Sequence, residues 1–452
     1  MGYEEEMEYR RVIREEMRRK HQEEDRALRI KLLAAGVILV LTIVIVGVIA
    51  LGASAQPDPT LPSTDPTLET VDPTVPSDGP TDPSTPSDPS DPSDPSDPVD
   101  PTPPPTDPTE LPDTTVIHFA AAGDINVNDT TAALDFGLAF RDILPLLSRA
   151  DLTAVNFEGN LLGEPYGAAS HSAPQSLMTA LKAAGVDLVQ MANSRSIVNG
   201  IPGLKTTLSA IRAAGLEPVG AWGTSEEARE AGGYTIREVE GVKIAIVAFT
   251  KGMDSMALPV GSENCVNLLY TDYATKYSKV DTAGITAILE RVAEEKPDVT
   301  IALVHWGSEF RDQISSTQKQ IRNLMLEQGV DAIIGTHSHY VQALDFDPEQ
   351  GTFVAYSLGD LLSDGQTAGT EYSIVLELEI TKNNLTGTTA ITGYSYTPIF
   401  NVRREGEQLR LMPLEDAIAA YEGGYMFRVS EDLYKDMLYA RTRIEDRVKP
   451  DQ

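Results

Sequence analysis

The sequence is poor in cysteine, in histidine and in aromatic residues. Of its 452 residues, one is a cysteine (Cys265), six are histidines, and 6% are aromatic. A single cysteine excludes any disulfide within the chain, so a folded region has to be stabilised by burial of apolar side chains. With so few histidines, those that share a neighbourhood become informative.

Basic residues are missing from residues 56–114, which consist almost entirely of Pro, Asp, Ser and Thr. Such a composition offers no apolar side chains for a core. Its prolines and its charge of one sign favour a semi-extended chain. We therefore predict a disordered linker that works as a stalk.

Acidic residues dominate the chain as a whole, with a formal net charge of -32. The charge is 0 over residues 1–55, -14 over 56–114 and -18 over 115–452. This balance argues against nucleic acid as a partner, because binding it requires a footprint of Lys and Arg. An anionic ligand would have to be held by a local metal ion or arginine.

One long apolar run, residues 32–55, contains no charged residue. It exceeds the roughly 20 residues that span a bilayer, and residues 1–31 before it are rich in Arg and Lys. We predict a cytoplasmic charged segment followed by a transmembrane anchor, with the remainder outside the cell. A cleaved signal peptide ending at Ala53-Ser54-Ala55 is the alternative, disfavoured because the run is longer than a signal core.

From residue 115 onward, short apolar runs alternate with amphipathic segments, which predicts an α/β fold. The predicted strands are 116–122, 152–156, 186–191, 243–249, 299–304 and 332–334, and the predicted helices are 176–184, 203–214 and 317–327. Gly185, Gly215 and Gly329 are expected to end these helices.

A second, partly antiparallel sheet is expected as well. The run 234–240 forms a hairpin with 243–249, and further β-structure is expected at 352–357, 373–380 and 388–396. We place the folded domain at residues 115–402. Residues 403–452 are predicted to form a helical extension that packs outside the core.

Three of the six histidines follow apolar runs that are predicted strands. His305 follows 299–304, and His337 and His339 follow 332–334. In an extended segment, alternate side chains point to the same side, so the last two could reach one point. A lone histidine at a strand end is more often a hydrogen-bonded structural residue, but three together favour metal or anion binding.

Oxygen-bearing side chains follow three other predicted strands. Asp124 follows the first, Glu158 the second and Asn193 the third. With the histidines they form a mixed oxygen and nitrogen set that suits one or two divalent metal ions.

These segments, in this order, resemble the CapA family of capsule and poly-γ-glutamate synthesis, whose domain is similar to calcineurin-like metallophosphoesterases. The motifs that carry the resemblance are Gly123-Asp124, Asn156-Phe157-Glu158-Gly159-Asn160-Leu161, His305-Trp306-Gly307 with Glu309, Gly335-Thr336-His337-Ser338-His339 with Gln342, and Tyr356-Ser357-Leu358-Gly359. The resemblance implies a four-layer α/β/β/α sandwich. It also implies a divalent metal ion, with Mn, Zn and Fe as the candidates, held by Asp124, Glu158, His305, His337 and His339.

One motif departs from the family pattern of Ala-Asn-Asn-His followed by Leu-Asp. Ser194 replaces the expected ligand asparagine, Arg195 the histidine, and Val198 the acid. Asp360 stands where the family tends to have Asn and would restore a ligand if it lies close enough. Arg195 can clamp an anion but cannot exchange a proton near neutral pH.

Three functions follow as hypotheses. The first is a membrane-anchored, extracellular CapA-like protein of capsule or poly-γ-glutamate biosynthesis or handling. It would act as a metal-dependent hydrolase, and its expected partners are an anionic polymer or the membrane proteins of capsule synthesis. Its catalytic candidates are Arg195 and His305, and its substrate-binding candidates are Asn156, Asn193, Arg195 and Glu309. The second is a non-catalytic polymer-binding or partner-binding protein on the same fold. The third is a wall-associated structural domain whose histidines only satisfy local hydrogen bonds.

Overall fold

The computed structural model describes residues 113–403, 407–424 and 429–450. The predicted cytoplasmic segment 1–31, the predicted anchor 32–55 and the predicted linker as far as residue 112 lie outside the described residues. Among the residues that are described, no helix is both long and apolar enough to cross a membrane.

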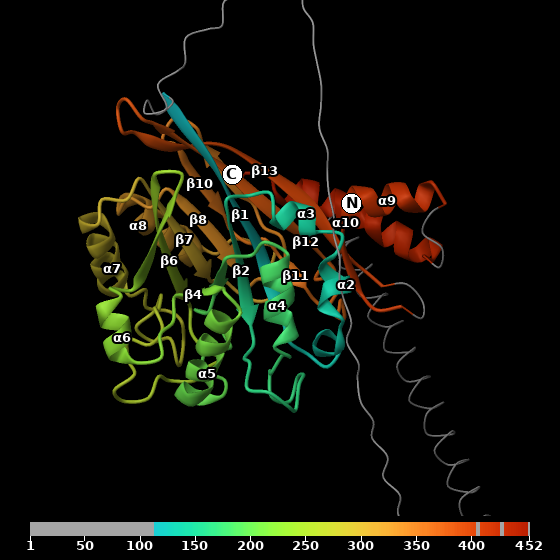
Figure 1. The fold of residues 1–452 in the computed structure, drawn as a ribbon, viewed down its shortest axis with the longest axis horizontal. Coiled ribbons are helices and arrows are strands. Elements are labelled where there is room, and N and C mark those ends of the chain that lie inside the picture. The colour runs from blue at the N-terminus through green and yellow to red at the C-terminus, as the bar shows by residue number, and fades with distance from the viewer. Residues whose placement is uncertain (1–112, 404–406, 425–428, 451–452) are drawn as a thin grey trace, which may run out of the picture. The chain divides into compact units, whose positions relative to one another are not determined.

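The first sheet combines a parallel half with an antiparallel half (Figure 1). In spatial order its strands are β14 (Arg410–Pro413), β13 (Thr389–Val402), β12 (Tyr372–Asn383), β1 (Thr114–Asn126), β2 (Leu152–Glu158), β3 (Leu188–Gln190) and β4 (Glu217–Val219). Strands β1 to β4 are mutually parallel, and β12 to β14 pair in the antiparallel sense. A short strand, β11 (Asp360–Leu362), pairs in parallel with the end of β1.

The second sheet has a parallel centre with an antiparallel strand at each edge. Its order is β5 (Tyr234–Val239), β6 (Val242–Thr250), β7 (Val299–His305), β8 (Ala332–Thr336), β10 (Thr352–Ala355) and β9 (Leu344–Asp347). The central strands β6, β7, β8 and β10 are parallel, so their carboxyl ends meet at one edge.

Helices pack against both sheets. The longer ones are α4 (Ser176–Ala183), α5 (Gly200–Ala213), α7 (Thr282–Glu294), α8 (Ser316–Glu327), α9 (Leu414–Glu422) and α10 (Glu431–Arg447); the short ones are η1 (Thr131–Ala133), α2 (Phe136–Phe140), α3 (Leu144–Leu147) and α6 (Ser225–Glu230). Helices α7 and α8 share a core with one face of the second sheet. The other face of that sheet shares the main core with the first sheet, α4 and α5.

The predicted mixed α/β fold with two sheets is confirmed. The helices at α4, α5 and α8 end where expected, because Gly185, Gly215 and Gly329 adopt φ of 94°, 79° and 83°, which favour glycine. Two of the later β-runs extend the first sheet, as β12 and β13, rather than the second.

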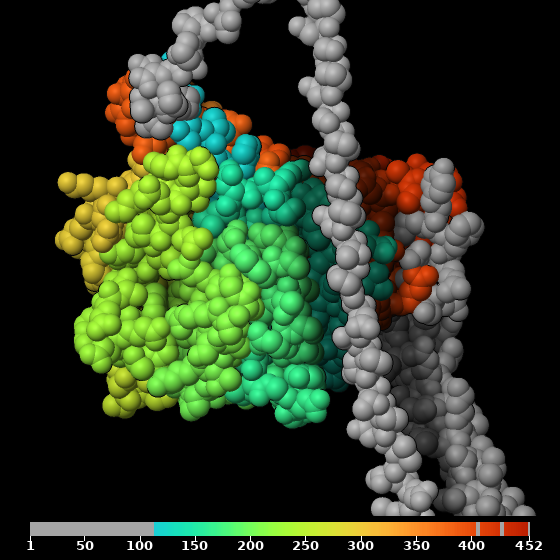
Figure 2. Space-filling view, in the orientation of Figure 1, coloured from blue at the N-terminus to red at the C-terminus, as the bar shows by residue number. Residues whose placement is uncertain are grey.

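The expectation that the C-terminal helices pack outside the core is wrong. Helix α9 buries Leu414, Ala417 and Ile418, and α10 buries Met437, Ala440 and Ile444, all within the main core. These apolar positions recur every three or four residues on helices whose other faces are highly charged, so charge dominates the composition and conceals the buried stripe. In Figure 2 the C-terminal segment, in red, lies beside the cyan and green segments at one edge of the visible face.

Two glycines let neighbouring chains approach the strands that carry candidate ligands. A Cβ on Gly123 would lie 1.8 Å from the carbonyl oxygen of Gly359, and a Cβ on Gly335 would lie 2.0 Å from that of Tyr356. Each clash is with backbone, so a larger residue would force the strands apart.

We therefore expect Gly335→Ala to lower the free energy of unfolding by about 1–3 kcal/mol, the usual range for overpacking. Gly137→Ala is the matched control, because Gly137 is exposed within α2 and its Cβ would meet nothing closer than 3.4 Å. Urea denaturation followed by circular dichroism measures both. Equal midpoints for the two variants would show that the close approach at Gly335 does not constrain the fold.

Candidate metal centre

The candidate ligands meet where parallel strands of both sheets end. Asp124 lies near the end of β1, Glu158 is the last residue of β2, His305 is the last residue of β7, and His337 directly follows β8. The carboxyl edge of parallel strands is where α/β folds commonly place ligand sites. The five residues predicted as ligands are therefore brought together, in two neighbouring groups.

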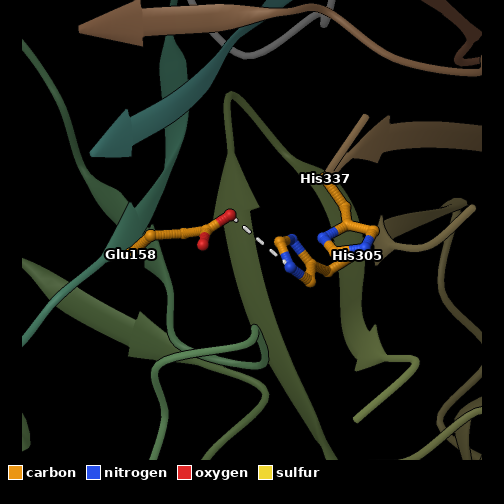
Figure 3. A group of neighbouring side chains, drawn as sticks. All are labelled: Glu158, His305 and His337. Carbon is orange, nitrogen blue, oxygen red and sulfur yellow. Dashed lines mark ion pairs between the residues drawn. The ribbon is translucent and has the colours of Figure 1, made fainter. Parts of the chain in front are cut away.

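The first group contains Glu158, His305 and His337 (Figure 3). One ligand atom from each lies within 4.8 Å of the others, and all three side chains are buried. Glu158 Oε1 is 3.5 Å from His305 Nε2, and the centroids of the two imidazole rings are 4.4 Å apart. The three residues come from β2, β7 and the end of β8, so both sheets contribute.

The second group contains Asp124, His339 and Asp360. His339 Nδ1 lies 2.8 Å from Asp360 Oδ1 and 3.7 Å from Asp124 Oδ2. Asp360 reaches this position because β11 pairs with β1, with Asp124 opposite Asp360. The residue that departs from the family pattern thus lies beside two predicted ligands.

The two histidines of the His-x-His motif do not reach one point by strand alternation, and that expectation is wrong. Strand β8 ends at Thr336, and His337 and His339 adopt φ of 89° and 58°. This turn sends His337 to the first group and His339 to the second. The backbone N–H of His337 donates to Asp124 Oδ2 at 3.0 Å, so the turn itself links the groups.

Two buried asparagines fix the frame of the site. Asn156 Nδ2 donates to Asp124 Oδ1 at 2.5 Å, and Asn156 Oδ1 accepts from Asn193 Nδ2 at 3.0 Å. The Asn193 amide also donates to the carbonyl of Phe157 and accepts from the N–H of Arg195. Both amides hold neighbouring groups in place, and their contact with a substrate stays a prediction.

The degenerate motif lies directly at the site. Ser194 Oγ is 3.1 Å from His305 Nε2, so the hydroxyl occupies the edge of the first group. The Arg195 guanidinium instead forms an ion pair with Asp254 at 2.5 Å. Arg195 would have to leave this partner in order to clamp an anion.

Two cavities of about 240 Å³ each open onto the ligand groups. The lysine cavity is lined by Ser194, Lys251, Asp254, Tyr277, Glu309 and His337, with Gly252 and Ser308. The arginine cavity is lined by Glu158, His171, Arg195, His339 and Asp360, among others, and also by Glu309. Glu309, predicted to bind substrate, is exposed and lines both.

Sequence reasoning missed Lys251, Asp254 and His171. Lys251 follows the apolar strand β6, so the rule that singled out the other residues applies to it as well. His171 and Asp254 lie in loops, and nothing in their local sequence points to the site.

The charges of the site are shaped by burial. Burial raises the pKa of Asp124 to about 6 and raises that of Glu158 well above its usual value. Burial also lowers the pKa of His305 and His337 well below the usual value, so both rings are neutral. For His339 burial opposes the charged form, but nearby carboxylates, Asp360 foremost, outweigh it and raise the pKa well above its usual value.

The donor atoms fit a cation. Among the residues that the structure describes, Glu158 Oε1 and both ring nitrogens of His337 are buried without a hydrogen-bond partner. A buried polar atom without a partner costs about 1–3 kcal/mol, so such atoms call for an explanation. Neutral imidazole and carboxylate are ordinary ligands of divalent transition metals, and a cation would satisfy Glu158 Oε1 and one ring nitrogen of His337.

The family of bacterial capsule synthesis proteins described as PGA_cap matches residues 118–365, more than half of the chain. The chain belongs to this family. The matched stretch contains both ligand groups. Helices α9 and α10 lie beyond it.

Curated relatives of this PGA_cap chain carry names from capsule synthesis. It is 26% identical over 257 residues to the capsule biosynthesis protein CapA of Bacillus anthracis, covering 54% of this chain and 58% of the relative. It is also 26% identical to the PGA biosynthesis protein CapA of Bacillus subtilis (strain 168), covering 54% and 61%. The chain thus spans about three fifths of the length of these relatives.

Among solved structures, the calcineurin-like phosphoesterase YfkN from Bacillus subtilis aligns with 74% of this chain and 98% of its own, at 16% identity and a TM-score of 0.40.

Arg447, the last residue of helix α10 in this PGA_cap protein, contacts residues of the matched stretch and just beyond it. The Arg447 guanidinium lies 4.8 Å from the ring centroid of Tyr340 and 5.7 Å from that of Tyr372. It also lies 3.5 Å from a carboxylate oxygen of Asp312 and donates to the Tyr372 hydroxyl. The cation is thus held between two aromatic faces.

A chain of ring contacts continues from there to the second ligand group. The rings of Tyr340 and Phe310 are 6.1 Å apart, and Phe310 stacks on His339 at 5.1 Å. The last turn of α10 therefore supports the loop that carries His339.

We expect Arg447→Met to lower the free energy of unfolding by about 1–3 kcal/mol, because the cation–π contacts and the charged hydrogen bonds are lost together. Arg441→Met on the same helix is the control, since the Arg441 side chain is 40% exposed and its one ion pair within the described part of the chain is with Glu415. Thermal unfolding checks the prediction. Equal losses for both variants would contradict a specific supporting role for Arg447.

Metal content tests the ligand groups without a known substrate. We expect the purified chain, supplemented with Mn²⁺, Zn²⁺ or Fe²⁺ and desalted, to retain a stoichiometric ion in each group by elemental analysis. His337→Ala should lose the ion of the first group and keep that of the second, because it removes a ligand of the first group alone. His118→Ala, a change at a half-exposed histidine outside both groups, should leave the metal content unchanged. An unchanged metal content in His337→Ala would rule out the first group as the binding site.

Proposed function

We propose that this chain is a CapA-like protein of capsule or poly-γ-glutamate biosynthesis or handling that acts as a metal-dependent hydrolase on an anionic polymer. The observation that carries the proposal is the pair of buried ligand groups, in which Glu158 Oε1 and the ring nitrogens of His337 have no hydrogen-bond partner among the described residues. Family membership supports the biological setting. The proposed domain is the four-layer sandwich similar to metallophosphoesterases.

Each ligand group has the residues to hold one divalent ion. Glu158, His305 and His337 would hold one, and Asp124, His339 and Asp360 the other. A bound divalent metal ion polarises a carbonyl or phosphoryl oxygen and lowers the pKa of bound water.

The residues around these groups position the ligand side chains and exclude bulk water. Thr336 Oγ1 lies 3.1 Å from His305 Nδ1 and fixes the ring, while Ser194 lies at its other nitrogen. Asn156 holds Asp124 by its amide. Burial excludes bulk water from both groups, which strengthens the interaction of their charges with any ion or developing negative charge.

Arg195 and His305 remain our catalytic candidates. His305 lies within the first group, and Arg195 would stabilise negative charge once freed from Asp254. Because arginine stays protonated near neutral pH, the chain has no proton donor at the position where the family has a histidine. Turnover of an ordinary phosphoester should therefore be slow.

The proposed location is the cell membrane, with residues 32–55 as a single anchor and the described domain outside the cell. The apolar run, its basic flank and the acidic stalk support it. The proposed partners are an anionic polymer and the membrane proteins of capsule synthesis.

The second candidate is a non-catalytic protein that binds a polymer or a partner through the same cavities. The observation that favours it is the degenerate motif, in which Ser194 and Arg195 replace residues that the family resemblance ties to metal and proton transfer. Folds commonly persist after their chemistry is lost.

The double change Ser194→Asn with Arg195→His separates the two candidates. If the lost motif alone limits turnover, the variant should hydrolyse bis(p-nitrophenyl) phosphate at least about a hundredfold faster than the wild type, the lower range for general acid–base catalysis. Activity is followed by release of nitrophenol in the presence of Mn²⁺.

Adding His337→Ala to the double variant is the control and should abolish the gain. A double variant that binds metal but shows no gain would contradict the hydrolase proposal and favour polymer binding.

A further inference from the structure

Lys251 places a positive charge at the edge of the candidate metal centre. It follows β6 directly, and its backbone N–H donates to the carbonyl oxygen of His305 at 2.8 Å. Its side chain is part-buried, with Nζ 4.7 Å from the ring centroid of Tyr277. The ammonium thus lies beside the first ligand group, on the wall of the lysine cavity.

The charge of Lys251 is not neutralised by an ion pair within the part of the chain that the structure describes. Its Nζ donates one hydrogen bond, to the carbonyl of Gly307 at 2.8 Å. An ammonium group has three N–H donors, so two remain for a ligand in the cavity. Burial lowers the pKa of Lys251, while Glu309 and Asp254 oppose that shift.

The charge of Arg195, in contrast, is neutralised by an ion pair. Its guanidinium is paired with Asp254 at 2.5 Å, which satisfies its charge. Lys251 therefore offers a cation at the site that needs no rearrangement to meet an anion.

The geometry of the lysine cavity narrows the class of ligand. A volume of about 240 Å³ admits a compact group, and neither ring nitrogen of His337, on the cavity lining, has a hydrogen-bond partner in the part of the chain that is described. Glu309 and Asp254 line the same cavity and repel a highly charged ligand. A compact oxyanion, such as a carboxylate or a phosphate, fits beside Lys251.

We propose that Lys251 binds an oxyanion of the substrate in the lysine cavity, next to the first ligand group. The inference rests on the proposed function and adds a substrate contact to it. A γ-linked glutamyl chain carries one free carboxylate per residue, and this carboxylate is the expected ligand.

Binding of two probes tests the inference in the full chain loaded with Mn²⁺. The probes are a γ-glutamyl tripeptide, which supplies carboxylates, and inorganic phosphate, with affinities measured by calorimetry. We expect Lys251→Gln and Lys251→Met each to lower the affinity for the tripeptide about tenfold, because each removes one hydrogen bond to a charged group. Lys243→Gln at the other end of β6, where Lys243 pairs with Glu295, is the control for loss of a lysine charge.

Metal content and thermal unfolding of every variant are measured in the same samples. A tenfold loss with unchanged metal supports the inference, and a larger loss for phosphate than for the tripeptide would identify phosphate as the group bound. Equal affinities in wild type and variants, no binding of either probe, or a loss of metal in the Lys251 variants would overturn it. A chain that holds no metal yet binds a probe through Lys251 would contradict the proposed hydrolase function and still support this contact.

Discussion

The structure depends on bringing three carboxylates and three imidazoles into a buried space where two sheets meet. Asp124, Glu158 and Asp360 are all nearly inaccessible to water, and the nearby His305 and His337 are neutral. Burying a carboxylate without a counter-charge is costly, so either protons or cations must balance the group. The raised pKa values of Asp124 and Glu158 favour balance by protons. Glu158 Oε1 and the His337 ring nitrogens, which lack a hydrogen-bond partner among the described residues, favour balance by a bound cation.

Backbone geometry determines where the ligand side chains lie relative to one another. Gly123 lets the Gly359 carbonyl approach, so that Asp360 lies beside Asp124. Positive φ at His337 and His339 turns the chain so that the two rings serve different groups. Such conformations cost about 1–3 kcal/mol each and persist where the surroundings determine them. The site is therefore built from close approaches between strands far apart in the sequence.

The sequence predicted much of this arrangement because each ligand follows an apolar strand. Asp124 and Glu158 share one strand-end edge, and His305 and His337 share another, because parallel strands within a sheet align their carboxyl ends. The division into two groups could not be predicted, because it depends on the turn at His337–His339 and on the pairing of β11 with β1. The ion pair of Arg195 with Asp254 was also beyond reach, since it joins two loops with no local signal.

The most direct test of the central claim is anomalous diffraction from crystals of the chain grown with Mn²⁺. The account predicts anomalous peaks within the two ligand groups, one bounded by Glu158, His305 and His337 and the other by Asp124, His339 and Asp360. Crystals saturated with Mn²⁺ that show no peak in either group would contradict it.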